Sequence, residues 1–381
     1  MLFNFKGGKC LGVSSKIKKV TIIGLGLIGG SWGMALKRTR PEINICGVDI
    51  DSNTIQIGIE TKCIDWGTLD IRQGVKDADL VVISTLVSSI TKIAEEIAPY
   101  LKPGCIVTDV GSTKEEITGI VNDLLPTTIH YVPGHPMAGS EAKGIIGADA
   151  YLFENAVYIL TPVLTTNDHA LLILKELIES MGARVLNLSP YEHDLKVAAI
   201  SHLPHVVAAA LVNAVSLLEE EQGEIFKLSA GGFRDLTRIA GSQPEMWRDI
   251  FLQNRQGVLQ SLSFFRQALD KIEKAIRQED MEDIYEFLMK AKNERSKIPI
   301  KVKGILPEVY EIVVTVPDKP GIIGAIANLL GKEEINIIDI EILRVREGDG
   351  GTIRFGFQKA DLRDRAVEIL RNHGFIAKVR S

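Results

Sequence analysis

A glycine-rich stretch near the start of the chain restricts the possible folds more than any other feature. The run IIGLGLIGG places Gly24, Gly26 and Gly29 in a G-x-G-x-x-G spacing between a β-rich segment and a helical pattern. In such a unit the first glycine makes the tight turn, the second lets the backbone approach a pyrophosphate, and the third lets helix and strand pack closely. Asp49 lies 20 residues after Gly29, where a carboxylate can bind adenosine ribose hydroxyls. The spacing favours a dinucleotide site over the alternative, a plain turn followed by a strand cap.

The charge of Asp49 predicts which dinucleotide binds. A carboxylate at this position would repel a 2′-phosphate, which favours NAD over NADP, while Arg38 and Arg40 nearby argue in the opposite direction. Free N–H groups at the start of the following helix would face the phosphates. The predicted cofactor contacts come from the glycine motif and from the ends of three strands: Gly24, Gly26, Leu27, Ile28, Gly29, Asp49, Ser84 and Asp109.

Apolar runs alternate with helical patterns from residue 19 to residue 189. The runs VTIIGLG, ICGVDI, LVVIST, CIVTDVG, AVYILTP and RVLNL are nearly continuously apolar, which is typical of strands covered by helices on both faces. This alternation predicts the α/β class, with a parallel, doubly wound, Rossmann-like dinucleotide-binding domain over 19–189. We expect residues 1–18, which precede it, to form a loosely ordered leader.

Two further domains are expected beyond residue 189. Residues 190–298 lack strand-like runs and predict an all-helical substrate and dimerisation domain. Its run LKVAAISHLPHVVAAALVNAVSLL is apolar on nearly every side, which predicts a helix buried all round and kinked at Pro204. Residues 299–307 form a linker with proline and glycine. Residues 308–381 show the order βαββαβ, a ferredoxin-like module.

Composition excludes several classes of partner. The 381 residues exceed one hydrophobic core, and the net charge of −5 argues against broad binding to nucleic acid. The four cysteines form no C-x-x-C pair, which indicates free thiols in a reducing compartment. We find neither a run of about 20 apolar residues nor the apolar core of a secretory signal, so we expect a cytoplasmic protein without a membrane segment. Small molecules and a second copy of the chain are the expected partners.

Two segments at predicted strand ends carry candidate catalytic side chains. Ser112 lies in DVGSTK, after the strand CIVT, and either acts on a ligand or caps the next helix in a capping box with Glu115. His135 lies in GHPMAGSE, at the end of the short strand IHYVPG, where Pro136 biases its backbone towards an extended conformation. A histidine at a strand end beside a nicotinamide site favours acid–base catalysis over a structural role.

The helical region supplies further polar groups. In SHLPH, Ser201, His202 and His205 fall within about one helical turn, and with no third ligand a metal site is not expected. Arg238, in FRDLTRIAGSQPEMW, suits recognition of a carboxylate, although a solvated or ion-paired arginine is the alternative. Ser242 in the same run also fits a capping box, with Pro244 early in the next helix.

These motifs, in this order, resemble the prephenate/arogenate dehydrogenases of tyrosine biosynthesis. The resemblance rests on GLGLIGGS, DVGSTK, GHPMAGSE, SHLPH and FRDLTRIAGSQPEMW, and covers most of residues 19–295. It implies NAD-dependent oxidative decarboxylation of prephenate to 4-hydroxyphenylpyruvate. It also implies that His135 is the catalytic base for the substrate hydroxyl and that Ser112 lies beside the same hydroxyl. The implied substrate-binding residues are Ser201, His202, His205, Arg238, Ser242 and Trp247.

The last 75 residues resemble an ACT domain, an amino-acid-sensing module, through VTVPDKPGIIGAIANLL and INIIDIEI. The resemblance implies feedback inhibition by L-tyrosine, and we expect the homodimer to bind the effector through Asp318, Pro320, Gly321 and Asn336. An arogenate dehydrogenase, another dehydrogenase of the same superfamily, and a non-catalytic amino-acid sensor on a nucleotide-binding fold are the alternatives.

Overall fold

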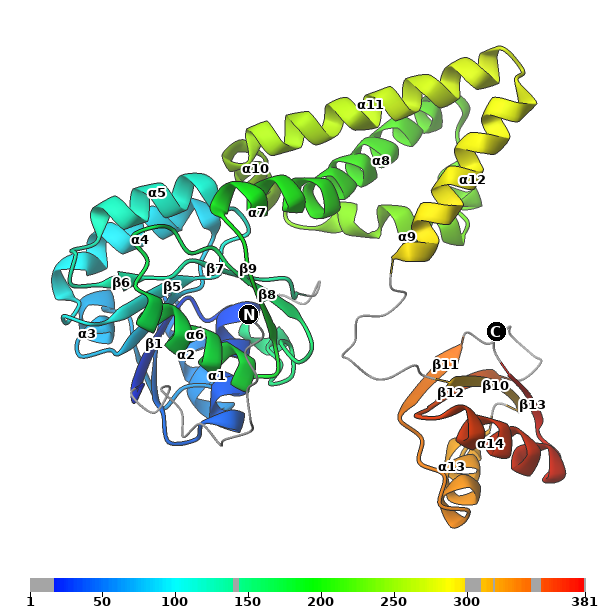
Figure 1. Cartoon of the computed structure of the whole chain (residues 1–381), viewed down its shortest axis with the longest axis horizontal. Helices are drawn as coiled ribbons and strands as arrows, with labels where there is room; N and C mark the ends of the chain where they lie inside the picture. Colours follow the sequence, from blue (N-terminus) through cyan, green and yellow to red (C-terminus); the bar gives the residue numbers. More distant parts are fainter. Residues whose placement is uncertain (1–16, 140–143, 299–309, 318, 344–350, 380–381) are drawn as a thin grey trace, which may run out of the picture. The chain divides into compact units, whose positions relative to one another are not determined.

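The computed structural model describes residues 17–139, 144–298, 310–317, 319–343 and 351–379. The chain divides into two compact units, with the division after residue 302 (Figure 1). The first unit contains the predicted dinucleotide-binding and helical regions, and the second contains the ferredoxin-like module. The expected linker at 299–307 and nearly all of the expected leader at 1–18 lie outside the described residues.

The first unit is built on a parallel sheet of six strands. The order β3-β2-β1-β4-β5-β6 places β1 between β2 and β4, so the chain reverses its direction of winding at β1. Ligands of open α/β sheets bind at this switch point, outside the carboxyl ends of the strands. The strands are β1 (Lys19–Ile23), β2 (Asn44–Val48), β3 (Trp66–Thr68), β4 (Leu80–Ile83), β5 (Ile106–Asp109) and β6 (His130–Tyr131).

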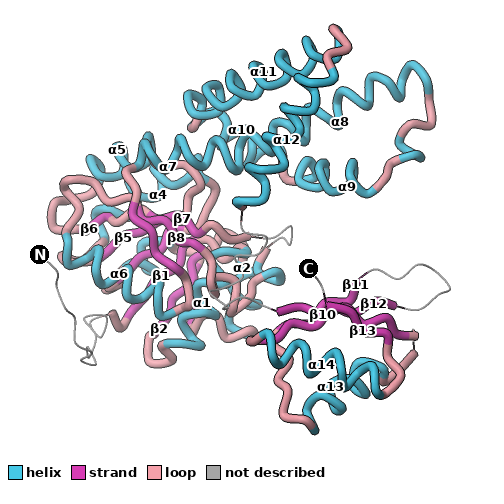
Figure 2. Tube along the Cα trace, turned by 45° about the vertical axis from the view of Figure 1, so that its right-hand side comes forward, coloured by secondary structure: helices cyan, strands magenta, loops and turns pink. Residues whose placement is uncertain are grey.

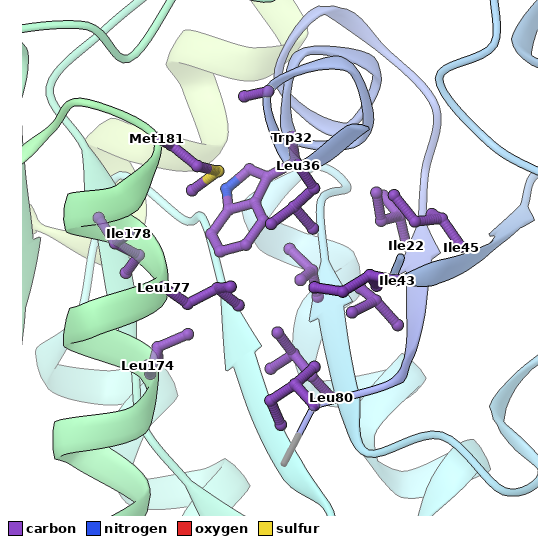
Figure 3. Close-up of a cluster of buried hydrophobic side chains, with 14 of the residues drawn as sticks. Ile22, Trp32, Leu36, Ile43, Ile45, Leu80, Leu174, Leu177, Ile178 and Met181 are labelled. Atoms are coloured by element: carbon purple, nitrogen blue, oxygen red, sulfur yellow. The ribbon is translucent and has the colours of Figure 1, made fainter. Parts of the chain in front are cut away.

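Helices cover both faces of this sheet, as predicted. Successive residues of β1 point to opposite faces, so that Ile22 joins one core cluster and Ile23 the other. In the first cluster the fully buried Trp32 packs among side chains at the end of α6 (Figure 3). The helices on this side include α1 (Leu27–Thr39) and α6 (Asp168–Ser180). Three helices contribute to the second cluster: α3 (Ile71–Val75), α4 (Ile90–Ile97) and α5 (Glu115–Leu124). The helix α2 (Ser52–Glu60) connects β2 to β3.

The runs AVYILTP and RVLNL do not extend the large sheet, contrary to the prediction. They form β8 (Val157–Leu160) and β9 (Arg184–Asn187), which join β7 (Gly134–Pro136) in a second sheet of three strands. The N–H of Val132 still bonds to β5, but Pro133 has no N–H and cannot continue the ladder. The chain therefore leaves the first sheet at Pro133, and β7 pairs antiparallel with β8.

The helical region begins with an irregular helix. An α-helix, α7 (Pro190–Val197), runs into a π-helical turn (Ala198–His202) and then into α8 (Leu203–Gln222). Pro204 has no N–H to donate to the carbonyl of Ile200, so the expected break takes the form of this π turn. The remaining helices are α9 (Gly231–Thr237), α10 (Pro244–Gln253), α11 (Arg255–Arg277) and α12 (Met281–Lys297) (Figure 1).

The expectation that the apolar helix is buried all round is wrong for the single chain. In α8 the buried residues are His205 and Ala208, while Leu217 is 66% exposed and Ile200, in the π turn, 69% exposed. By length and composition alone, the helical run 190–222 is apolar enough to cross a membrane. An 18-residue stretch of it has a mean hydropathy of 1.6, and 28% of that stretch is buried. One such helix is weak evidence for a membrane segment, because the core helix of a soluble protein passes the same test. Other exposed apolar side chains follow on α11 and α12: Leu259, Phe264, Leu269, Ile276, Tyr285 and Leu288.

The second unit has the predicted βαββαβ order (Figure 2). Its antiparallel sheet has the order β11-β12-β10-β13, and one face packs against two helices through residues such as Ile312, Phe355 and Leu370. The second strand begins at Asp339, the fifth residue of the run INIIDIEI. The elements are β10 (Tyr310–Val316), α13 (Ile322–Lys332), β11 (Asp339–Leu343), β12 (Gly351–Phe357), α14 (Ala360–Asn372) and β13 (Ile376–Val379).

Candidate active site

The glycine motif forms the turn between β1 and α1. Gly24 has φ +90, and a Cβ there would lie 2.3 Å from the carbonyl oxygen of Ser84. A Cβ on Gly29 would lie 2.0 Å from the carbonyl oxygen of Gly24, so both positions require glycine. A Cβ on Gly26 would meet nothing within 4 Å, and among the described residues no side chain caps the first N–H groups of α1. The start of α1, with Leu27 and Ile28, can therefore receive a phosphate.

Asp49 anchors this loop from the end of β2. Its carboxylate accepts hydrogen bonds from the N–H groups of Leu25, at 2.8 Å, and Asp51, at 3.1 Å. The guanidinium of Arg38 donates to the carbonyl of Met181 at 3.2 Å and lies 4.5 Å from the ring centroid of Tyr151. Arg38 therefore interacts at the end of α6, whereas the carboxylate of Asp49 binds the loop of the glycine motif.

The carboxyl ends of three neighbouring strands meet beside this loop. The N–H of Ser84 donates to the carbonyl of Ile23 at 2.7 Å, and the N–H of Val110 donates to that of Ile83 at 3.1 Å. Ser84 and the loop 110–114 therefore lie at the same sheet edge as the glycine motif. This edge is where the switch point of the sheet places a ligand.

Asp109 acts on this site through the loop that follows it. Its side chain is fully buried, and its oxygens accept hydrogen bonds from the Tyr131 hydroxyl at 2.8 Å, from the Gly111 N–H at 2.8 Å and from the Lys114 ammonium. The fully buried Lys114 was not among the residues predicted from the sequence. These donors reach both oxygens of the buried carboxylate, so the pair of Asp109 and Lys114 fixes the shape of DVGSTK, and contact of Asp109 with the cofactor stays a prediction.

Ser112 lies in this loop and is partly exposed, but it does not cap α5. The helix begins at Glu115, and the carboxylate of Asp194, from α7, accepts the N–H groups of Lys114 at 2.8 Å and Glu115 at 2.9 Å. The predicted capping box is therefore wrong, because an acid distant in sequence satisfies the helix N-terminus. This leaves the hydroxyl of Ser112 available for a ligand.

His135 lies within β7 rather than after a strand, which corrects its predicted position. Its Nδ1 lies 2.8 Å from Nε2 of His193, whose Nδ1 lies 2.7 Å from the carboxylate of Asp194. Burial, followed by the charges of His193, Lys114 and His202, holds the pKa of His135 well below 6.5. The ring is neutral at physiological pH and can accept a proton.

A second cluster forms around Trp247 on α10. The ring of His205 stacks on the Trp247 indole at 3.7 Å between centroids, and His202 meets it edge-on at 6.0 Å. Asn254 donates to the carbonyl of Asp194 at 2.7 Å, and its amide lies 3.2 Å from Nδ1 of His202. Within this cluster, three buried nitrogens have no hydrogen-bond partner among the described residues: Nε2 of His202, Nδ1 of His205 and Nε1 of Trp247. Buried polar atoms of this kind mark a place where a polar ligand can bind.

The other predicted substrate residues occupy separate positions. Ser201 lies in the π turn before His202 and is partly exposed. Arg238 begins a 3-10 turn (Arg238–Gly241) after α9 and is exposed. The Ser242 hydroxyl donates to the carbonyl of Ile239 at 2.8 Å and does not cap α10, whereas Pro244 is the first residue of that helix, as predicted. No group of three potential metal ligands occurs within the described ranges.

Three of the four predicted effector residues can be placed in the second unit. Pro320 and Gly321 precede α13, and Gly321 has φ +85 as the N-cap of that helix. Asn336 is exposed in the segment before β11. Asp318 lies outside the described residues.

The glycine turn, the acid after β2 and the neutral histidine beside the switch point define the class of a dinucleotide-dependent oxidoreductase. Models of three families match consecutive parts of the chain: the nucleotide-binding domain of prephenate dehydrogenase over residues 32–187, its dimerization domain over 189–290, and the ACT domain over 310–370. The chain belongs to the prephenate dehydrogenase family.

Individual relatives agree with this assignment. The chain is 39% identical to a prephenate dehydrogenase of Bacillus subtilis, over 92% of this chain and 95% of the relative. Among solved structures, it is similar to a prephenate dehydrogenase of Aquifex aeolicus in complex with hydroxyphenyl propionate and NAD+, with a TM-score of 0.71 and 34% identity over 74% of this chain and 99% of the other. It is also similar to an arogenate dehydrogenase of Synechocystis, with a TM-score of 0.65 and 33% identity over 74% and 100% of the two chains.

Four polar residues of this region were missed from the sequence: Lys114, His193, Asp194 and Asn254. Their partners lie far along the chain: His193 is 58 positions after His135, and Asp194 is 80 positions after Lys114. The sequence offered one signal for these residues. His193 and Asp194 are adjacent just before a long apolar helix, and a surface turn does not explain a polar pair at that place. The structure brings that pair against the two loops that the motifs did identify.

Proposed function

We propose that this protein is an NAD-dependent prephenate dehydrogenase, which converts prephenate to 4-hydroxyphenylpyruvate and CO2. The observation that carries the proposal is the neutral His135 after the carboxyl end of β6, which His193 and Asp194 link to the loop of Ser112, together with a helical cluster that has unpaired buried nitrogens. The Bacillus subtilis relative and the Aquifex aeolicus structure with NAD+ support the substrate and the cofactor. The site fits NAD, since Gly26 leaves open space and Asp49 carries a negative charge.

The residues of the chain supply proton transfer and orientation. A bound NAD+ would supply the hydride acceptor for the ring carbon that carries the hydroxyl. His135 accepts the proton of that hydroxyl, the ring carboxylate departs as CO2, and its electron pair completes the aromatic ring. The phenolic oxygen then recovers the proton from His135, so the histidine returns to its neutral form. Because the ring becomes aromatic, the protein needs orientation more than a strong electron sink.

The substrate carries two carboxylates, and the helical region offers groups that can bind them. His202 has Nδ1 facing the Asn254 amide, so its proton lies on the unpaired Nε2, and the unpaired Nε1 of Trp247 is also a donor. We assign these two donors, with His205, Ser201 and Ser242, to the substrate pocket. Arg238 provides the positive charge for one carboxylate.

We propose that the protein is a homodimer that assembles through the helical region. The exposed apolar side chains of the π turn, α8, α11 and α12 support this, as does the match to a dimerization domain over 189–290. Burying this surface against a second copy removes it from water, which also accounts for an apolar helix that is mostly exposed in one chain. A cytoplasmic location stays a prediction.

Formation of NADH with prephenate and with arogenate, measured side by side, tests the activity. We expect prephenate to be the better substrate, and His135→Asn to lower kcat by about 10²–10⁴-fold while KM changes little. The matched control is His130→Asn, a partly exposed histidine on β6, which should retain wild-type turnover. A preference for arogenate would reassign the substrate. An absence of NADH with either compound would favour a non-catalytic amino-acid sensor.

We further propose that L-tyrosine inhibits the enzyme through the second unit. The match to an ACT domain and the glycine turn before α13 support this assignment. A chain that ends at residue 302 should retain turnover and lose inhibition, because the chain divides there into separate compact units. Undiminished inhibition of the truncated chain would place the effector at the active site instead.

A further inference from the structure

Three side chains from two parts of the chain form one hydrogen-bonded series beside the active site. His135 Nδ1 meets His193 Nε2 at 2.8 Å, and His193 Nδ1 meets the carboxylate of Asp194 at 2.7 Å. His193 is fully buried, and the side chain of Asp194 is 4% exposed. Neither side chain has a part in the mechanism proposed above, although both are costly to bury.

The direction of each hydrogen bond follows from Asp194, the last residue of the series. The carboxylate of Asp194 also accepts two backbone N–H groups, those of Lys114 and Glu115, so its orientation is fixed and it acts as an acceptor. His193 must therefore carry its proton on Nδ1, which leaves a lone pair on Nε2. That lone pair accepts the Nδ1 proton of His135, and the lone pair of His135 is then on Nε2.

Both rings hold a single proton at neutral pH. Burial lowers the pKa of His193 more than the hydrogen bond that it donates to Asp194 raises it, with Lys114 lowering it further. The charged and titratable groups that face His135 are His193 on α7, Lys114 before α5 and His202 in the π turn, and with burial they lower its pKa. One proton on each ring gives this series a single consistent set of donors and acceptors.

We propose that His193 and Asp194 are positioning residues that hold His135 in the tautomer with a free lone pair on Nε2. This inference rests on the proposed function, in which that nitrogen accepts the proton of the substrate hydroxyl. Asp194 also caps α5, directly after the loop that carries Ser112. One carboxylate therefore sets both the proton of the catalytic histidine and the start of the helix behind the serine.

The test compares two substitutions of His193. In His193→Leu the acceptor for the His135 Nδ1 proton is lost, and kcat should fall by about 10- to 100-fold with KM nearly unchanged. In His193→Gln the amide oxygen can accept that proton, so this variant should recover most of the lost turnover. His169→Leu, an exposed histidine of α6, is the control for a histidine-to-leucine change and should match wild type.

A spectroscopic measurement separates this inference from the proposed reaction. The chain has seven histidines, and ¹⁵N-labelled histidine in the full chain, assigned with His135→Asn, reports which ring nitrogen bears the proton. We expect protonated Nδ1 in wild type and His193→Gln, and protonated Nε2 in His193→Leu. Protonated Nε2 of His135 in wild type would overturn the inference even if the enzyme oxidises prephenate, and so would wild-type kcat in His193→Leu. If His193→Leu does not fold, the wild-type spectrum still decides.

Discussion

Each unit of this protein holds a buried cation that pairs with one or more carboxylates, but the two clusters differ in their access to water. In the first unit, Lys114 and Asp109 are both fully buried, with Tyr131 as a further donor. In the second unit Arg354 of β12 is 1% exposed, while its three carboxylate partners are 25% to 46% exposed. These partners are Glu311 on β10 and Asp339 and Glu341 on β11.

The balance of positive and negative charge in each cluster follows its access to water. The buried pair in the first unit carries one positive and one negative charge, because an excess charge without water is expensive. In the second unit three negative groups surround one positive group, and water at the carboxylates offsets their repulsion. Burial disfavours the charged guanidinium, but the hydrogen bonds of Asp339 and Glu341 and the charge of Glu311 raise the pKa of Arg354 overall. The comparison predicts that removing the cation costs more in the first unit than in the second.

The largest effect is expected from Lys114→Met. This change leaves the charge of Asp109 buried at the end of β5 without its cation, and should lower the free energy of unfolding of the first unit by about 3–5 kcal/mol. It should also abolish most turnover, because the loop that presents Ser112 depends on this pair. Thermal or denaturant unfolding of the full chain, followed together with NADH formation, measures both effects.

A double variant separates the charge from the packing. Asp109→Asn combined with Lys114→Met removes both charges and should recover much of the lost stability, since a neutral amide still accepts the Gly111 N–H. The control Lys175→Met removes an exposed lysine of α6 that pairs with Glu179, and should change stability little. If Lys114→Met unfolds like wild type, the pair is not the element that fixes the loop.

Local patterns were sufficient to predict the architecture of both units. The glycine spacing with Asp49, the alternation of strands and helices, and the βαββαβ order each depend on neighbouring residues, and the structure contains all three. The departures arise where a distant contact or a missing N–H decides the outcome. Pro133 ends the pairing of β6 and diverts the chain into a second sheet, and Asp194 replaces Ser112 at the start of α5.

The motifs indicated which residues form the candidate site, but not which residues hold them in place. His135, Ser112, His202 and Asp49 follow from motifs at strand and helix ends, where ligands of such folds bind. Periodicity and motif spacing did not indicate that His193 and Asp194 would reach these loops, since 58 to 80 residues separate the partners. Similarly, an apolar helix that looks like core in the sequence is exposed in one chain, because a hydrophobic pattern alone does not distinguish burial within a chain from the burial against a second copy that we propose.

Arg354→Met should have the smaller effect of the two cation substitutions. The three carboxylates lose a partner that bonds Asp339 at 2.7 Å and Glu341 at 2.8 Å, but their exposed fractions let water replace it. We expect the second unit to lose about 1–3 kcal/mol of unfolding free energy at neutral pH, after discounting for solvent screening. Basal turnover with prephenate should not change, since the first unit forms its own compact core.

Acid should narrow the gap between Arg354→Met and wild type. In the variant the ionised carboxylates repel one another without the cation between them, and adding protons to them relieves that repulsion. Unfolding of the full chain between pH 4 and pH 8, as a difference from wild type, measures this slope. The control Arg363→Met, in which a partner of Asp364 on α14 is removed, should show no such slope. A stability difference from wild type that stays constant between pH 4 and pH 8 would mean that Arg354 acts by packing between strands. The two buried cations would then stabilise the protein by different interactions, rather than differ in their access to water.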